Sequence, residues 1–146
     1  MKYCYLFDID GTLADLTHRL HHIQKQPKDW DAFFAACPRD MPIAHICSLA
    51  RTLSVHAPIV LVSGRSDRVR TETDYWIKVS AQIIYAGLYM RTDGDHRPDH
   101  EVKGELLDRI LDDGWKPLMA FDDRNQVVAM WRKRGVPCAQ VADGDF

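Results

Sequence analysis

The stretch Tyr3-Cys4-Tyr5-Leu6-Phe7-Asp8-Ile9-Asp10-Gly11-Thr12 decides the fold of this chain. Residues 3–7 form an apolar run with the length of a buried strand, and Gly11 is the type of residue that ends such a run. Asp8 and Asp10 therefore lie at the carboxyl end of a core strand. Burying charge there is costly unless a cation or a reaction uses it, and this end of a parallel strand is where α/β proteins bind ligands.

Two further apolar strands are expected at 58–62 and 117–121, and each ends in a polar cluster. These clusters are Ser63-Gly64-Arg65 and Asp122-Asp123. The other elements expected are helices at 43–54, 67–80, 100–113 and 124–134 and short strands at 83–90 and 138–141. Strands that alternate with helices indicate crossover connections and a mainly parallel sheet. The polar clusters at the strand ends should therefore meet at one edge of this sheet.

The length, composition and net charge limit the class of protein to which this chain can belong. With 146 residues, of which 46% are hydrophobic, the chain has the size and core of one domain, so we expect a single domain over 1–146. Its net charge of −2 lacks the basic excess of proteins that coat nucleic acid. No apolar stretch approaches the 18 or so residues of a membrane span. The four cysteines are scattered and Asp8 interrupts the only candidate signal segment, so we expect reduced thiols and a cytoplasmic protein.

The converging groups suit phosphoryl transfer. Asp8 or Asp10, together with the Asp122-Asp123 pair, can supply the carboxylate oxygens that Mg²⁺ accepts. Ser63 offers a hydroxyl group for phosphate, and Lys103 can neutralise both a phosphate and the crowded carboxylates. One aspartate can attack phosphorus to give an aspartyl-phosphate, while a second serves as acid and base. Crowding should raise the pKa of one carboxyl of this pair and so favour the acid role.

Four motifs in this order resemble those of the haloacid dehalogenase (HAD) superfamily: Asp8-x-Asp10-Gly-Thr12-Leu, Ser63-Gly64-Arg65, Lys103 and Asp122-Asp123. The resemblance implies a Rossmann-like, three-layer α/β fold with a small cap insertion after the first strand, at about 17–41. It implies that Asp8 is the nucleophile and Asp10 the general acid and base. It further implies Mg²⁺ bound by Asp8, Asp10, Asp122 and Asp123, and substrate phosphate bound by Thr12, Ser63, Gly64 and Lys103.

A closer resemblance covers most of the chain. The segments 62–65, 122–132 and 140–146 are similar to the phosphatase domains of polynucleotide kinase/phosphatases of the T-even phage type. This likeness implies a 3′-phosphate on DNA or RNA as substrate, and it suggests a phage origin with function in the host cytoplasm. It adds Arg19, Arg65 and Asp99 to the substrate-binding residues. The chain has no G-x-x-x-x-G-K-[ST] motif, so we expect no 5′-kinase activity.

Several alternatives stay open from the sequence. The second hypothesis is a small-molecule phosphatase for nucleoside monophosphates. A polynucleotide phosphatase should prefer an oligonucleotide 3′-phosphate to a mononucleotide, which separates the two hypotheses. A binding module without activity is disfavoured because every expected acid and Lys103 are present. The residues do not decide whether the protein opens cyclic phosphates, forms a homo-oligomer, or has a separate kinase or ligase partner.

Two groups of residues in the expected cap allow more than one interpretation. Its three histidines are expected on a solvated face rather than at a metal: His18, His21 and His22. Three aromatic residues have the near-helical spacing of internal packing, which we favour over stacking on bases: Trp30, Phe33 and Phe34. Outside the cap, Arg91 and Arg97 fit a solvated loop and a substrate clamp equally well.

Overall fold

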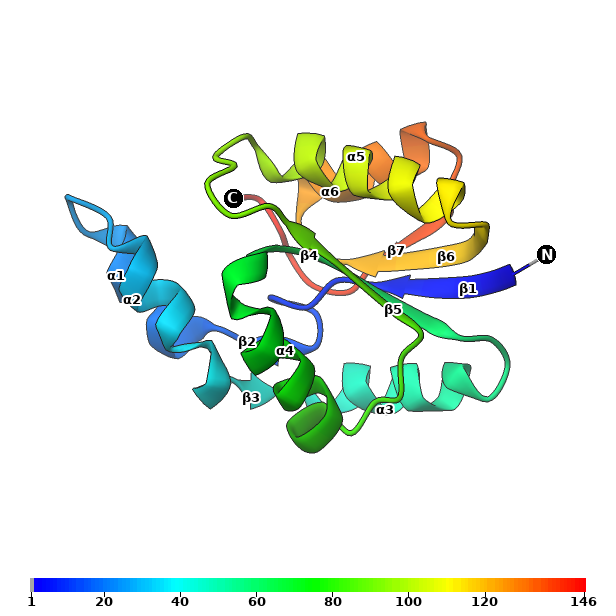
Figure 1. Ribbon diagram of the computed structural model, residues 1–146, viewed down its shortest axis with the longest axis horizontal. Coiled ribbons are helices and arrows are strands. Elements are labelled where there is room, and N and C mark those ends of the chain that lie inside the picture. Colours follow the sequence, from blue (N-terminus) through cyan, green and yellow to red (C-terminus); the bar gives the residue numbers. More distant parts are fainter. Residues whose placement is uncertain (1) are drawn as a thin grey trace.

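A five-stranded, wholly parallel sheet forms the centre of the computed structural model, which describes residues 2–146 (Figure 1). The strands lie in the order β5-β4-β1-β6-β7. Their bounds are Lys2–Phe7 for β1, Ile59–Ser66 for β4, Gly87–Arg91 for β5, Trp115–Asp122 for β6 and Cys138–Gln140 for β7. The expected parallel α/β sheet is therefore confirmed, with β1 at its centre.

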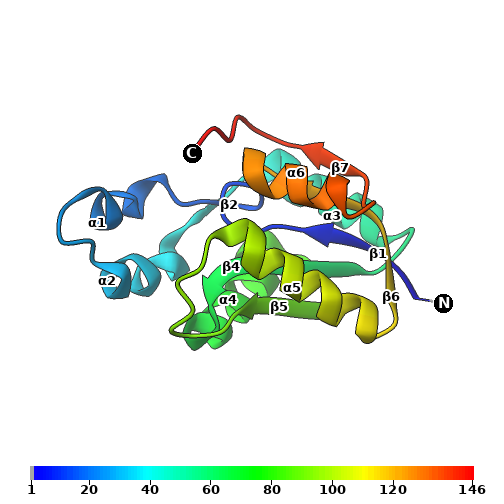
Figure 2. The ribbon, with the colours of Figure 1, turned by 90° about the horizontal axis from the view of Figure 1, so that it is seen from above.

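Helices cover both faces of this sheet and make three layers (Figures 1 and 2). Helices α5 (Asp99–Asp112) and α6 (Asn125–Lys133) lie on one face. Helices α3 (Ala44–Ser54) and α4 (Arg70–Trp76) lie on the other, with the 3₁₀ turn η3 (Asp67–Val69) before α4 and the π-helical turn η4 (Ile77–Ala81) after it. The Rossmann-like arrangement is thus as predicted.

The central strands are apolar throughout because each alternates its side chains between two cores. Leu6, Val60 and Val62 face the core beneath α5 and α6. Phe7 and Leu61 face the core on the side of α3. The polar clusters begin at the carboxyl edge, although Ile9 and Leu13 continue the second core into the turn after β1.

Residues 17–41 form a separate projection beside the carboxyl edge (Figure 2). A two-residue antiparallel pair, β2 (Ala14–Asp15) and β3 (Met41–Pro42), holds the base of this segment. Between these strands lie η1 (Thr17–Arg19), α1 (His21–Gln24), α2 (Trp30–Ala35) and η2 (Cys37–Arg39). The sequence did not predict the strand pair, because two residues are too few to show a period.

Three elements differ from the expected bounds: β4, the helix expected at 67–80, and β5, which begins at Gly87 rather than near residue 83. β4 continues to Ser66, past the expected end, and its pairing with β5 is irregular between Ser63 and Ser66. The expected helix at 67–80 is divided into η3, α4 and η4, and Gln82 closes it in a left-handed conformation with φ of 56°. No helix within residues 2–146 is long and apolar enough to cross a bilayer.

Candidate active site

Asp8 lies directly after β1, and the turn that follows it requires glycine at position 11. Gly11 has φ of 83°, and a Cβ atom there would lie 2.1 Å from Asp123 Oδ2. The turn is closed by the bond from Gly11 N–H to the Ala14 carbonyl oxygen at 2.9 Å. Asp8 N–H donates to the Phe121 carbonyl oxygen at 3.0 Å, which fixes the end of β1 against β6.

Both oxygens of the buried Asp8 carboxylate have donors. Thr12 Oγ1 donates to Oδ2 at 2.9 Å, and Lys103 Nζ donates to Oδ1 at 2.7 Å. Lys103, buried on the first turns of α5, also donates to Asp122 Oδ2 at 2.9 Å and lies 3.8 Å from Asp99 Oδ2. Three carboxylates, those of Asp8, Asp99 and Asp122, thereby surround one ammonium group.

The residues around Asp8 carry an excess of negative charge. Asp8, Asp122 and Asp123 each place an oxygen within 4.8 Å of the others, and all three are buried. Lys103 is the cation that contacts this group among residues 2–146. Buried carboxylates without a matching positive charge are costly, and an all-oxygen donor set is the kind that Mg²⁺ accepts. The observed residues therefore fit a hard divalent cation.

The same excess charge shifts the pKa values in this group. Burial, reinforced by the negative charge of Asp122, raises the pKa of Asp8 well above its usual value, although Lys103 opposes the shift. Burial likewise raises the pKa of Asp123 to about 6. Burial acts to lower the pKa of Lys103, but attraction to Asp122 and Asp8 outweighs it and raises that pKa well above the usual value.

Asp10 belongs to a second cluster, in which the charges balance. Its Oδ1 accepts from Arg19 Nη2 at 2.8 Å and from Arg65 Nε and Nη2 at 3.0 and 2.7 Å. Both guanidinium groups also reach Asp40, so two arginines face two carboxylates. The carboxylate of Asp10 is not in the oxygen group of Asp8, Asp122 and Asp123, and a role for Asp10 in binding metal stays a prediction.

The pKa of Asp10 moves in the opposite direction to that of Asp8. Burial raises it, but the positive charges of Arg65 and Arg19 outweigh burial and hold it below the usual value. The raised pKa expected for one of the two acids is thus found on Asp8, not on the expected general acid. Asp10 Oδ2 accepts no hydrogen bond within the described chain, and the side chain is 24% exposed.

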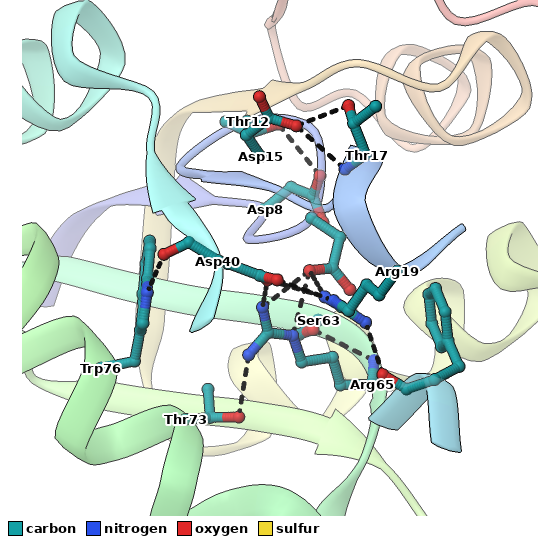
Figure 3. Close-up of polar contacts among 12 residues, drawn as sticks. Asp8, Thr12, Asp15, Thr17, Arg19, Asp40, Ser63, Arg65, Thr73 and Trp76 are labelled. Atoms are coloured by element: carbon teal, nitrogen blue, oxygen red, sulfur yellow. Dashed lines mark hydrogen bonds and ion pairs between the residues drawn. The ribbon is translucent and has the colours of Figure 1, made fainter. Parts of the chain in front are cut away.

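Asp40, which the sequence did not single out, joins the projecting segment to the body of the fold. Its Oδ1 accepts from Arg19 Nε at 2.8 Å and lies 2.7 Å from His18 Nε2, while Oδ2 accepts from Arg19 Nη2 at 2.8 Å and Arg65 Nη2 at 2.9 Å. Trp76 Nε1 donates to the Asp40 carbonyl oxygen at 2.8 Å (Figure 3). No spacing in the sequence predicts this position, since its role depends on contacts 21 and 25 residues away.

Ser63 and Gly64 bring β4 to the same edge. Ser63 Oγ accepts from Arg65 N–H at 3.1 Å, and its own proton has no acceptor in residues 2–146. A Cβ atom on Gly64 would lie 2.0 Å from Asp99 Oδ1, so only glycine lets this carboxylate pack there. Arg91 Nε donates to the Gly64 carbonyl oxygen at 2.8 Å, and Arg91 Nη2 lies 3.4 Å from Asp99 Oδ1.

The final residues of the chain pack over the Asp122-Asp123 turn. Gln140 Nε2 donates to the Asp123 carbonyl oxygen at 2.9 Å. Asn125 N–H donates to the Gly144 carbonyl oxygen at 2.9 Å, and Arg124 Nε to that of Phe146 at 2.9 Å. Residues 140–146 therefore fix the acidic turn from the outside.

The structure also places the arginines and histidines for which the sequence left two interpretations. Arg91 holds the loop before α5, because its Nη1 donates to the carbonyl oxygens of Asp95 and Arg97 at 3.0 and 2.7 Å. Arg97 lies on the surface, where it pairs with Asp95 and Glu105. His21 and His22 are on the surface of the projection, with ring centroids 4.0 Å apart.

Comparison with known proteins identifies the family. The family described as the polynucleotide kinase PNKP phosphatase domain matches residues 2–146. A putative bifunctional polynucleotide kinase/RNA ligase of Autographa californica nuclear polyhedrosis virus is 30% identical over 133 residues, which are 90% of this chain and 18% of that protein. The chain thus spans less than a fifth of this curated relative.

Solved structures agree with this family. A chain of the Pnkp1/Rnl/Hen1 complex has a TM-score of 0.84 at 30% identity, over 100% of this chain and 47% of that one. A haloacid dehalogenase-like hydrolase, SP0104 from Streptococcus pneumoniae, has a TM-score of 0.67 at 14% identity over 96% of this chain and 84% of its own, which shows the shared fold. The chain belongs to the phosphatase-domain family of polynucleotide kinases, within the HAD superfamily.

Proposed function

We propose that this phosphatase domain removes 3′-phosphate from the ends of DNA or RNA strands, with Mg²⁺ and through an aspartyl-phosphate intermediate. One observation carries the proposal: Asp8, bonded to Lys103 and Thr12, lies beside a second acid that two buried arginines hold. That arrangement offers a nucleophile, a proton carrier and fixed positive charge at one strand edge. Membership of a polynucleotide kinase phosphatase family supports the class of substrate.

In the first step, an Asp8 carboxylate oxygen attacks phosphorus and the bond from phosphorus to the 3′-oxygen breaks. The leaving oxygen takes a proton from Asp10, whose Oδ2 is free of hydrogen bonds within the described chain. Lys103, Ser63 and the two arginines stabilise charge on the phosphoryl oxygens. The products are a free 3′-hydroxyl group and phosphate bound covalently to Asp8.

In the second step, water attacks the phosphorus and Asp10 takes its proton, which releases inorganic phosphate and restores Asp8. Arg65 and Arg19 lower the pKa of Asp10 and so favour the ionised form that this step needs. The negative charge of an incoming phosphate acts in the opposite direction and favours the protonated form that the first step needs. Asp10 can therefore serve in both directions.

Mg²⁺ fits the oxygen group of Asp8, Asp122 and Asp123, and Asp10 is expected to assist there. When bound, it neutralises negative charge on the phosphate and on these carboxylates. Lys103 keeps Asp8 in place, and residues 140–146 keep Asp123 in place.

Residues 17–41 are proposed to act as a small cap, because their base carries Arg19 into the site. The relative named for polynucleotide kinase and RNA ligase supports a place beside strand joining, since a ligase needs a 3′-hydroxyl group. A separate kinase or ligase partner is therefore part of the proposal.

The test is phosphate release, with Mg²⁺ and with chelator, from a 3′-phosphorylated oligonucleotide, its 5′-phosphorylated form and a 3′-mononucleotide. DNA and RNA versions separate the two polymers. We expect Mg²⁺-dependent release that is fastest from the 3′-phosphorylated oligomer. Equal or faster release from the mononucleotide would instead establish the nucleoside monophosphate phosphatase.

Two substitutions test the chemistry. Asp8→Asn should abolish turnover with the fold intact, and Asp10→Asn should slow it strongly. Wild-type turnover in Asp8→Asn would exclude the covalent intermediate. Unchanged turnover in Asp10→Asn would assign the proton transfer to another group.

A further inference from the structure

Trp30 is the exposed aromatic residue of the cap. Its exposed fraction is 43%, whereas Phe33 is 5% exposed and lies inside. Phe34 stacks on the Trp30 ring with centroids 6.0 Å apart and an interplanar angle of 28°, and Phe33 meets it edge-on at 5.7 Å. Phe33 and Phe34 therefore pack against Trp30, as expected for internal packing, whereas part of Trp30 stays exposed.

A chain of contacts joins this ring to the active site. The guanidinium carbon of Arg19 lies 4.3 Å from the centroid of the Phe33 ring. Arg19 Nη2 in turn donates to Asp10 at 2.8 Å. Phe33 and Arg19 thus connect the Trp30 ring to the proposed proton carrier, Asp10.

The surface beside Trp30 favours an anion. The loop 25–31 lines an open hollow of about 480 Å³, with Lys25 and Lys28 on its wall. Lys28 Nζ lies 5.9 Å from the Trp30 ring centroid, and in the described chain neither lysine forms an ion pair.

The two acids of this loop already have partners. Asp29 accepts from Ala32 N–H at 3.0 Å at the start of α2, and Asp31 pairs with Arg68 at 2.8 Å. The pair with Arg68 neutralises Asp31, whereas a backbone N–H leaves the negative charge of Asp29 in place. Lys25 and Lys28 therefore carry one positive charge more than the remaining carboxylate of this segment.

We infer that Trp30 is a stacking platform for one base of a single-stranded polynucleotide, upstream of the 3′-phosphate, with Lys25 and Lys28 facing its backbone. The inference rests on the proposed function and names the part of the cap that distinguishes a strand from a mononucleotide. An aromatic face stacks on any base, and positive groups beside it attract phosphodiesters, which is how sequence-tolerant single-strand sites are built.

The first experiment compares Trp30→Ala with wild type on 3′-phosphorylated oligomers and on a 3′-mononucleotide. We expect kcat/KM on oligomers to fall roughly tenfold or more, the loss typical of one stacked base, with the mononucleotide unchanged. Trp30→Phe should restore most of the oligomer activity. Equal losses on both substrates, or no loss on oligomers, would overturn the platform.

Tyr3→Ala is the matched control. Tyr3 is 44% exposed and has Lys116 Nζ 5.6 Å from its ring, but it lies at the amino end of β1, away from the carboxyl edge. Its removal should leave the preference for oligomers unchanged.

A second experiment removes single bases from the substrate. An abasic site at the stacked position should cost wild type activity and cost Trp30→Ala almost none, because both changes remove one interaction. Equal costs in both proteins at every position would refute the inference.

A binding measurement separates failure of the platform from failure of the proposed function. Asp8→Asn and Asp8→Asn/Trp30→Ala are titrated with a fluorescent 3′-phosphorylated oligomer. Weaker binding by the double variant supports the platform even if wild type releases no 3′-phosphate, which would refute only the proposed function. Equal binding overturns the platform.

Discussion

Replacing Asp40 with asparagine tests whether this carboxylate holds Arg19 of the projecting segment and Arg65 of β4 together. The side chains of Asp40, Arg19 and Arg65 are all fully buried. Asparagine keeps the shape but leaves two guanidinium groups with one carboxylate, and it turns an amide N–H₂ toward one of them. Removing one partner of a buried ion pair costs about 3–5 kcal/mol, because the remaining charge stays buried without compensation.

For a chain of 146 residues this loss corresponds to a decrease in Tm of roughly 10–15 °C. Urea unfolding followed by far-UV circular dichroism gives the free energy of unfolding. Asp31→Asn is the matched control, because its pair with Arg68 is exposed, at 86% and 37%, and should contribute less than about 1 kcal/mol. If the free energy of unfolding of Asp40→Asn lies within about 1 kcal/mol of the wild-type value, Asp40 does not hold the two arginines.

Three other predictions follow from the site. Gly64→Ala should displace the Asp99 carboxylate, since the new Cβ would lie 2.0 Å from Oδ1, and phosphate release should fall at least about tenfold while circular dichroism stays unchanged. Mg²⁺ should raise the Tm of wild type by binding the folded state, and Asp122→Asn should lose that increase in a thermal-shift assay. Without metal, the folded pKa of Asp123 is about 6, above its ordinary 3.8. Its contribution to stability is therefore present below about pH 4 and lost as pH rises to about 6. Asp123→Asn should thus gain Tm relative to wild type between pH 4.5 and 7.5, and a constant difference would contradict the shift.

The strand ends could be predicted because their position depends on a general rule of parallel sheets. The apolar runs before Asp8, Ser63 and Asp122 identify three strands, and parallel strands place their carboxyl ends at one edge. Lys103 follows from the position of α5 against β4 and β6. These contacts are set by periodic patterns that a single sequence carries.

The balanced cluster could not be predicted in the same way. Asp10, Arg19 and Arg65 were each expected at the site from the resemblance, but the ion pairs of both arginines with the Asp10 carboxylate were not predicted. Arg65 reaches it because β4 continues past its expected end, through an irregular stretch that no pattern marks. Asp40 is recognisable only once both arginines are in place.

The two clusters explain why the pKa values of two acids that lie two residues apart shift in opposite directions. Asp8 lies among carboxylates that outnumber Lys103, so its negative charge is costly and its pKa is raised. Asp10 lies in a group with as many arginines as carboxylates, so its negative charge is favoured and its pKa is lowered. In the proposed mechanism, a phosphate bound between them meets positive charge already fixed on the side of Asp10, whereas the side of Asp8 needs a cation before it can accept another anion. The different roles proposed for the two acids thus follow from the charged groups that each one contacts, and the projecting segment contributes by bringing Arg19 to Asp10.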